Sequence, residues 1–384
     1  HKLYQMKILM VSMRSLHFTR WANQLEGAGH EVYWFDIRDG GFPLGNSPWL
    51  KQIFGWKNRF QYPGYYYIKN KMPFLFRFLQ FFNERSVDDE FDKVIKQIKP
   101  DAVHSFALYV SCTPILKVME NHKHIPWIYS SWGSDLFYFQ NEPNFLRDIK
   151  SVLPRVNYMF SDCQRDYYIA KEYGFQGDFL GVFPGGGGFH LNELNPYLIP
   201  FEDRDIVLIK GFQGRSGRVI EVLKAIKEVV FALTNYRIFV FGADSSVFQF
   251  AEEIKLSEEQ NVTIKGRLPH EEVLRLMGKS ILYIGNSNSD GLPNTLLESI
   301  CMGAFPIQSN PGGVTEEIIE NNKNGLLIND CMDVSEIKNQ ILTALRNPAM
   351  VRTGIQYNLK AIKPTLEFDL IKSQVLAKYN AILQ

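Results

Sequence analysis

A loop at residues 287–298 combines acids, a glycine turn and a helix start at spacings that could bind a phosphorylated ligand. The apolar run 281–284 predicts a buried strand before this loop, and Pro293 suits the first turn of a helix after it. The free N–H groups of a helix start attract an anion, and ligands of parallel sheets bind beyond the carboxyl ends of the strands. Asp290 and Glu298 are separated by roughly two helical turns, so both can face one ligand.

An ordinary explanation exists for each acid taken alone. An Asp before a helix is usually an N-cap, and a single helical Glu usually faces solvent. A second loop of the same kind favours a binding site, because a predicted strand at 305–308 is followed by a glycine-opened helix start at 311–316. We therefore expect the two adjacent loops to form one site.

These loops resemble those of glycosyltransferase family 4, whose members use nucleotide sugars, have the GT-B fold and retain the anomeric configuration. The family pattern is an acid, a glycine turn, a Glu eight positions on, and then Gly-Gly-x-x-Glu. The matching residues are Asp290, Glu298, Gly312, Gly313 and Glu316, and the family more often has Glu at the position of Asp290. The resemblance covers most of the chain and is specific from 283 to 328.

The resemblance implies roles for these residues. Glu298 would bind the ribose hydroxyls of the donor, and Asp290 and Glu316 would line the donor sugar. Backbone N–H groups near Gly313 would assist, and the leaving phosphate would take the acceptor proton on the same face, so no protein nucleophile is expected. Further predicted donor contacts are Gly291, Leu292, Asn294 and, in the loop where relatives hold the base, Arg267.

A second anion cradle is predicted by a strand at 206–209, a glycine-rich basic loop and a helix from 219. Family members place an Arg and a Lys of this loop on the donor diphosphate. The candidates here are Lys210, Arg215 and Arg218; together with Asp290, Lys210 and Arg215 are predicted to be catalytic, and Arg218 to bind substrate. A dinucleotide site is not predicted, because the acidic ribose ligand about 20 residues on is missing.

One pattern suggests a metal site. Asp203-Arg204-Asp205 has the spacing of the metal-binding motif of the other glycosyltransferase fold. It lies in a linker before a buried strand, whereas magnesium sites are built where a substrate phosphate can join them. We therefore predict a charged turn and no metal.

The chain length of 384 residues and the alternation of apolar runs with amphipathic segments predict a two-domain α/β protein. We expect two Rossmann-like domains facing a cleft, an acceptor-binding domain at 6–195 and a nucleotide-sugar-binding domain at 203–363. Four glycines at 185–188 mark the approach to the boundary. By the GT-B resemblance, residues 364–384 form a C-terminal helix that crosses back to the first domain.

Two residues of the first domain are candidates for the donor sugar. The family often has two histidines after one strand and His-Gly-x-Asp after the next, and here His104 and Asp135 remain while Phe106 and Trp132 take the other positions. The sugar contact can therefore lie with His104 or with Asp135. A single histidine at a strand end is more often a structural hydrogen-bonding residue.

Residues 48–85 are rich in aromatic and basic side chains, among them Trp49, Trp56, Lys57 and Arg59. This mixture suits an anionic membrane surface. The alternative is that the aromatic rings form core and the bases its solvated rim, and this alternative is slightly favoured because long segments need apolar residues for packing.

The composition is that of an ordinary globular protein. The net charge of +1 gives no indication of nucleic-acid binding, and the four cysteines are too widely spaced for a metal site. No apolar run approaches about 20 residues, and the start of the chain has no signal-peptide pattern. We expect a cytoplasmic protein, with peripheral contact to the inner membrane face left open.

The predicted activity is that of a retaining hexosyltransferase with no cofactor. It would move a sugar from a UDP- or GDP-sugar to a glycan or polyprenyl-linked acceptor, in surface polysaccharide or glycolipid synthesis. One alternative is a nucleotide-sugar epimerase on the same fold, which would have a basic, histidine-rich pocket in the first domain. The other is a non-catalytic protein that binds sugar nucleotides.

Overall fold

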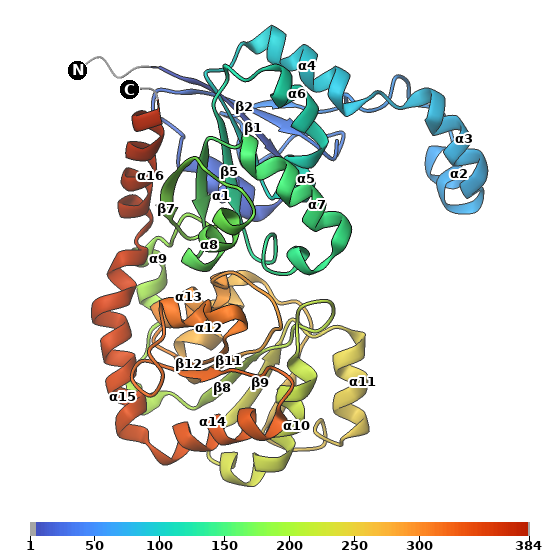
Figure 1. The fold of residues 1–384 in the computed structure, drawn as a ribbon. Coiled ribbons are helices and arrows are strands. Elements are labelled where there is room, and N and C mark those ends of the chain that lie inside the picture. The colour runs from blue at the N-terminus through green and yellow to red at the C-terminus, as the bar shows by residue number, and fades with distance from the viewer. Residues whose placement is uncertain (1–4, 383–384) are drawn as a thin grey trace. The chain divides into compact units, whose positions relative to one another are not determined.

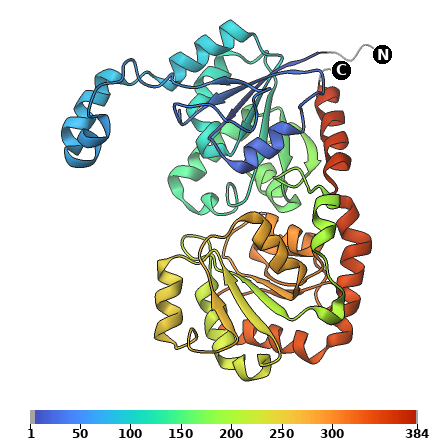
Figure 2. The same ribbon diagram turned by 180° about the vertical axis from the view of Figure 1, so that it is seen from behind.

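The computed structural model describes residues 5–382, which form two compact units (Figures 1 and 2). Unit 1 comprises residues 5–161, 167–186 and 375–382, and unit 2 comprises residues 162–166 and 187–374. The predicted domain limits stay predictions, although the chain changes unit within the predicted run of glycines. Residues 383–384 of the predicted C-terminal helix lie outside the described part of the chain.

Unit 1 is built on a seven-stranded parallel sheet with the order β3-β2-β1-β4-β5-β6-β7. The strands are β1 (Lys7–Ser12), β2 (Glu31–Asp36), β3 (Lys51–Ile53), β4 (Ala102–Phe106), β5 (Trp127–Ser131), β6 (Tyr158–Ser161) and β7 (Asp178–Val182). β4 and β5 are buried at every position, which requires cover on both faces of the sheet.

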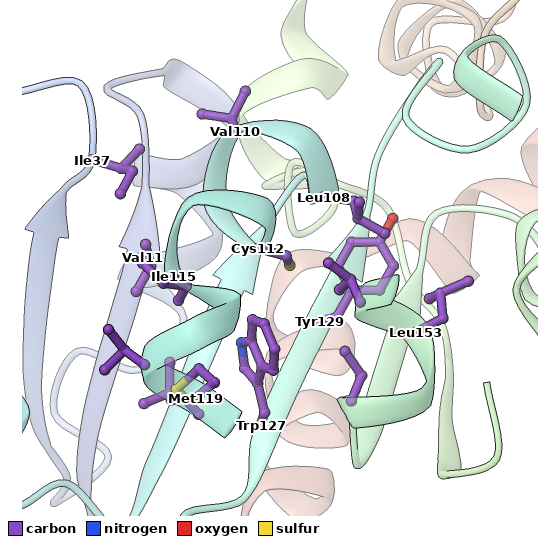
Figure 3. Close-up of a cluster of buried hydrophobic side chains, with 14 of the residues drawn as sticks. Val11, Ile37, Leu108, Val110, Cys112, Ile115, Met119, Trp127, Tyr129 and Leu153 are labelled. Atoms are coloured by element: carbon purple, nitrogen blue, oxygen red, sulfur yellow. The ribbon is translucent and has the colours of Figure 1, made fainter. Parts of the chain in front are cut away.

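Helices on both sides of this sheet supply that cover (Figure 1). They are α1 (Leu16–Asn23), α4 (Val87–Ile98), α5 (Leu108–Ser111), α6 (Leu116–Asn121), α7 (Pro143–Val152) and α8 (Gln164–Glu172), while α2 (Tyr65–Lys71) and α3 (Pro73–Asn83) form a separate hairpin. Figure 3 shows one core cluster, in which Trp127 and Tyr129 of β5 lie among side chains of α5 and α6. The buried indole N–H of Trp127 donates to Ser105 Oγ at 2.9 Å, so its polar atom is satisfied.

Unit 2 is built on a six-stranded parallel sheet with the order β10-β9-β8-β11-β12-β13. The strands are β8 (Ile206–Lys210), β9 (Arg237–Phe241), β10 (Val262–Ile264), β11 (Ser280–Gly285), β12 (Phe305–Ser309) and β13 (Leu326–Ile328). The helices are α9 (Leu191–Leu194), α10 (Val219–Val229), α11 (Ser245–Glu253), α12 (His270–Gly278), α13 (Asn294–Cys301), α14 (Val334–Arg346), α15 (Pro348–Tyr357) and α16 (Phe368–Ile382).

The strand order of each sheet contains one reversal. In unit 1 the chain fills one side of β1 before it continues at β4, and in unit 2 it fills one side of β8 before it continues at β11. Ligands of such open sheets bind beyond the carboxyl ends of the strands at this reversal. The loops after β8, β11 and β12 therefore lie where a ligand site is expected.

The predicted crossing helix is confirmed by α16. It starts in unit 2, where Phe368 packs on His190 with ring centroids 4.3 Å apart, and its residues from Val375 onward belong to unit 1. There the fully buried hydroxyl of Tyr379 accepts a hydrogen bond from Trp21 Nε1 at 3.1 Å. The helix thus contributes a buried ring to unit 1.

The strands predicted at 206–209, 281–284 and 305–308 agree with β8, β11 and β12 to within one residue at each end, and the differences concern short or atypical elements. β3 was not predicted, because Lys51-Gln52-Ile53 lacks an apolar pattern. Pro293 lies at the N-cap of α13, not in its first turn, because its ψ of 130° is extended. The predicted helix start at 311–316 forms only the short 3-10 turns Pro311–Gly313 and Thr315–Glu317, because Gly312 and Gly313 have φ values of 63° and 80°.

Candidate functional site

Three loops at the carboxyl edge of the unit 2 sheet are joined by hydrogen bonds. Asn288 N, in the loop after β11, donates to Ser216 O in the loop after β8 at 2.9 Å. Ser287 N donates to Ser309 Oγ at the end of β12 at 2.8 Å. The two predicted ligand loops and the basic loop therefore form one continuous surface of unit 2.

The turn before α13 is closely packed. A Cβ at Gly291 would lie 2.2 Å from Asp162 Oδ2, so a side chain there would displace the Asp162 carboxylate. Leu292 and Asn294 follow at the helix start, and both are partly exposed. The structure thus brings these three predicted donor contacts together at the end of a helix whose first N–H groups have no intrahelical partner.

Asp290, the first predicted acid, is half-buried in this turn. Burial raises the pKa of its carboxyl, while the positive charge of Lys210 and the N–H of Gly291, at 2.9 Å from Oδ1, oppose that rise. Asp290 and Lys210 are thus close enough to interact electrostatically. This places an acid and a base at the same loop junction.

The three predicted cations differ in their surroundings. Lys210 is half-buried at the end of β8, and Arg215 is exposed. Arg218 Nη1 donates to the carbonyl oxygens of Gly214 at 2.8 Å and Gly217 at 2.6 Å. Arg218 therefore holds its own loop in shape, and its contact with substrate stays a prediction.

Glu298, the second predicted acid, is buried on α13 and has a partner that the sequence did not indicate. Its Oε1 lies 2.6 Å from Nε2 of His270, at the start of α12. No sequence motif links Glu298 and His270. They come together because α12 packs against β11 and β8. Arg267, three residues before His270, is exposed.

Glu316 is held in place by the loop that carries the paired glycines. Asn310 Nδ2 donates to Glu316 Oε1 at 2.7 Å, and Asn310 Oδ1 accepts from Thr315 N at 2.9 Å. Gly313 stands beside this acid, with the position of its missing Cβ 3.8 Å from Glu316 Oε2. Glu316 therefore has one carboxylate oxygen turned toward the glycine backbone.

Arg165 ties the two acidic loops together and was missed by sequence reasoning. Its guanidinium donates from Nη1 to Pro311 O at 2.7 Å and from Nη2 to Asp290 O at 2.8 Å. Asp166 pairs with the same guanidinium at 2.8 Å. The positions of both loops thus depend on one buried arginine, which belongs to unit 2 although it stands far earlier in the chain.

Several buried polar atoms at this edge have no hydrogen-bond partner among residues 5–382. They are Tyr283 Oη, Gln308 Oε1, Asn288 Oδ1 and Asn294 Oδ1. Tyr283 and Gln308 converge at Gly285, where a Cβ would lie 2.3 Å from Gln308 Oε1 and 2.9 Å from Tyr283 Oη. Buried polar groups are nearly always satisfied, so these atoms offer hydrogen-bonding capacity to a polar ligand or a water.

Two family models match the sequence. The model "Glycosyl transferases group 1" matches residues 198–361, which include all three loops, and the model "Glycosyl transferase 4-like" matches residues 65–163. Together the two matches indicate the GT-B glycosyltransferase superfamily. A search of curated proteins found no match.

Solved structures share the fold over nearly the whole chain. Sucrose-phosphate synthase from Thermosynechococcus elongatus superposes with a TM-score of 0.74 at 16% identity, covering 99% of both chains. Anabaena Alr3699/HepE in complex with UDP-glucose gives 0.69 at 12% identity, covering 98% of this chain and 100% of its own. A putative UDP-N-acetylglucosamine 2-epimerase from Listeria monocytogenes gives 0.63 at 12% identity, covering 99% and 97%. At these identities the similarity establishes the GT-B fold.

The two candidate donor contacts of unit 1, His104 and Asp135, have hydrogen-bond partners inside that unit. His104 is fully buried, with Nδ1 2.6 Å from Tyr379 Oη and Nε2 2.8 Å from Ser130 Oγ. Both oxygens of the buried Asp135 accept from Leu108 N, at 2.9 and 2.8 Å, and Oδ2 also accepts from the Tyr129 hydroxyl. The structure gives both residues structural roles.

The chain also contains two groups of acids that could suggest a metal. Asp205, of the predicted charged turn, pairs with both arms of Arg237, at 2.7 and 2.8 Å. Asp162, Cys163 and Asp166 bring possible ligand atoms within 4.8 Å of one another. This second set suits a metal poorly, because Arg165 already neutralises Asp166 and burial raises the pKa of the Cys163 thiol.

Proposed function

We propose that the protein is a retaining glycosyltransferase that moves a hexose from a UDP- or GDP-sugar to a glycan or lipid-linked acceptor. The observation that carries the proposal is the convergence, at the β8–β11 reversal, of Lys210, Asp290 and partnerless buried polar atoms. A nucleotide sugar has the phosphates, hydroxyls and base that such a surface would bind. The UDP-glucose complex of the similarly folded HepE supports this choice of ligand.

In the proposed reaction the bond between the sugar carbon and the diphosphate oxygen breaks. A new bond forms from the acceptor oxygen to the same carbon, and the acceptor proton passes to the departing phosphate. Lys210, Arg215 and the N–H groups at the start of α13 would stabilise the leaving diphosphate, and the Asp290 carboxylate would face the cation-like sugar. Glu298, fixed by His270, would bind the ribose. No metal and no cofactor takes part.

The epimerase alternative is weakened by unit 1. It calls for a basic, histidine-rich pocket, and His104 is enclosed by hydrogen bonds and aromatic rings. The non-catalytic alternative is favoured by no observation of the described residues, because Lys210 and Asp290 are both in place.

The test is incubation of the protein with UDP- and GDP-sugars without an acceptor. We expect at least one nucleotide diphosphate to raise the melting temperature, and its sugar to be hydrolysed slowly with retained configuration, followed by NMR. Binding without hydrolysis, even after addition of candidate acceptors, would favour the non-catalytic protein. A sugar nucleotide returned with an inverted ring carbon would identify an epimerase.

A further inference from the structure

A helical hairpin of unit 1 presents aromatic rings to solvent. We define the aromatic hairpin as residues 60–83, which contain α2 and α3. In both views it lies apart from the sheet of unit 1 (Figures 1 and 2). Its two helices meet where Tyr65 of α2 packs edge-on against Phe76 of α3, with ring centroids 5.3 Å apart.

The burial pattern of α3 is inverted relative to an ordinary surface helix. Its buried residues are the polar Gln80 and Asn83. Its exposed residues are aromatic: Phe74 is 84% exposed, Phe78 62%, Phe81 80% and Phe82 58%. α2 adds Tyr66 at 74% and Tyr67 at 66%. Apolar patches of this kind on a folded protein mark a surface that another molecule or a membrane covers.

The base of the hairpin is built by specific polar contacts. Asn83 and Phe60 exchange two hydrogen bonds, Phe60 N to Asn83 Oδ1 and Asn83 Nδ2 to Phe60 O, each 3.0 Å. Gln80 Nε2 donates to Asn58 Oδ1 at 3.1 Å. The chain just before them is fixed by Trp56, which is buried and stacks on Phe35 with centroids 5.0 Å apart. The exposed rings are therefore held on a supported element.

The prediction for residues 48–85 therefore has a different outcome before the hairpin and within it. Trp56 belongs to the core, so the favoured alternative of core and rim is right for this residue. Trp49 is partly buried and donates to Asn23 Oδ1 at 3.1 Å. The rings of the hairpin do not form core, so the favoured alternative of core and rim was wrong there.

The charges around the rings select the partner. No Asp or Glu occurs between Gly40 and Asn83, whereas that stretch contains Lys51, Lys57, Arg59, Lys69, Lys71 and Arg77. Within the hairpin, Lys69, Lys71 and Arg77 are exposed beside the rings. Basic groups beside apolar side chains complement an anionic lipid surface, where rings enter the headgroup region and cations contact phosphates.

We propose that the aromatic hairpin inserts its phenylalanines into the surface of an anionic membrane and holds the protein there. No helix among residues 5–382 is long and apolar enough to span a bilayer, so the contact is interfacial. The proposal does not depend on the sugar-nucleotide site, and its test uses neither donor nor acceptor.

The experiment is co-sedimentation of the full chain with vesicles of phosphatidylcholine, with and without phosphatidylglycerol. We expect binding only to the anionic vesicles, lost as salt shortens the Debye length toward about 8 Å. The triple variant Phe74→Ser, Phe78→Ser, Phe81→Ser should bind at least about tenfold more weakly. Neutralising Lys69, Lys71 and Arg77 to Gln should weaken binding by roughly a hundredfold.

Phe231→Ser is the matched control, because this ring is 73% exposed and lies in unit 2, outside the aromatic hairpin. It should bind vesicles as the unchanged protein does, and all variants should keep the melting temperature. Equal vesicle binding by the triple variant would overturn the proposal. So would sedimentation of the unchanged chain as a dimer that the triple variant dissociates, with no vesicle binding, because a second copy would then cover the hairpin.

Discussion

The two sheets carry polar residues at the same carboxyl edge but treat them differently. In unit 1, His104 and Asp135 have all their polar side-chain atoms in hydrogen bonds within the unit. In unit 2, Tyr283 and Gln308 keep buried oxygens with no partner in the described chain. Since buried polar atoms are rarely left unsatisfied, Tyr283 and Gln308 keep hydrogen-bonding capacity for a polar ligand, whereas His104 and Asp135 are already satisfied inside unit 1.

Aromatic packing explains why His104 is enclosed in unit 1. The ring of His104 stacks on Phe106 at 4.0 Å between centroids, and Phe106 in turn lies 4.9 Å from Trp132. Phe106 and Trp132 stand at the positions where the family often has further histidines. Burial among these rings lowers the pKa of His104 well below its usual value, so the ring is neutral.

The largest expected effect is on turnover, and it comes from replacing Asp290 in unit 2, with the same replacement of Asp135 in unit 1 as the control. Asp290→Asn should lower turnover by about 10²–10³-fold, because a charge facing the cation-like sugar acts in the transition state. It should change affinity for the free nucleotide diphosphate far less. Initial rates and calorimetry measure the two. Because burial raises the pKa of Asp290, activity should be lost, as pH falls, above the ordinary value of 3.8.

The matched control is Asp135→Asn in unit 1. It removes an acceptor from Leu108 N and Tyr129, so stability should fall while the turnover of the folded protein stays the same. Equal losses of turnover in both variants would break the comparison and return Asp135 to the donor sugar. Full turnover in Asp290→Asn would leave that acid as an ordinary loop residue.

The second effect concerns nucleotide binding. Glu298→Gln should weaken affinity for nucleotide and nucleotide sugar alike by roughly ten- to a hundredfold, since a charge-assisted hydrogen bond to ribose contributes about 1.5–3 kcal/mol in both states. His270→Asn should have a smaller effect in the same direction, because His270 only orients the carboxylate at 2.6 Å. Calorimetry with the nucleotide diphosphate measures both. Unchanged affinity in Glu298→Gln would contradict the ribose assignment.

Sequence alone could place the acids but not their supports. Asp290, Glu298 and Glu316 stand in a spaced pattern that strand-loop-helix reasoning can position at one edge. Arg165 and His270 stand far from that pattern along the chain and reach it only through tertiary packing. A local sequence pattern cannot predict these contacts, because Arg165 lies in α8 and His270 in α12.

The fold was predictable where apolar periodicity is strong, as in the parallel strands β1 and β8. The hairpin was not, because α3 has the apolar composition of a core helix and its exposure depends on what surrounds it. His104 was open for a similar reason: its role depends on Tyr379, 275 residues later in the chain.

A third prediction tests the structural role of His104 through the stability of unit 1. His104→Gln should lower the free energy of unfolding by about 1–3 kcal/mol, because it disturbs the buried bonds to Tyr379 and Ser130. It should leave nucleotide affinity unchanged. In the unchanged protein the folded ring stays neutral, whereas the unfolded chain takes up a proton below pH about 6.5. His104 therefore makes stability fall as pH drops below that value.

The pH dependence gives this test a signature beyond simple destabilisation. The slope from His104 can reach about 1.4 kcal/mol per pH unit, and the variant should lack it. Urea unfolding at several pH values between about 5 and 7 measures the difference in slope. Weaker nucleotide binding by the folded variant would instead join His104 to the donor site.

The smallest expected effect is that of removing metal. Lys210, Arg215 and the start of α13 supply the positive charge that a diphosphate needs, so activity should survive excess EDTA. Asp205→Asn should also keep full turnover, because it loses only an exposed pair with Arg237, which contributes about 0–1 kcal/mol to stability. A metal would be indicated if EDTA abolishes activity and magnesium or manganese restores it. The two variants Asp205→Asn and Asp162→Asn then identify the ligands, because the variant that lacks a ligand no longer responds to the ion. A response lost only in Asp162→Asn would place the metal beside Gly291, at the donor loop itself, and would make the unit 2 edge a metal-assisted site.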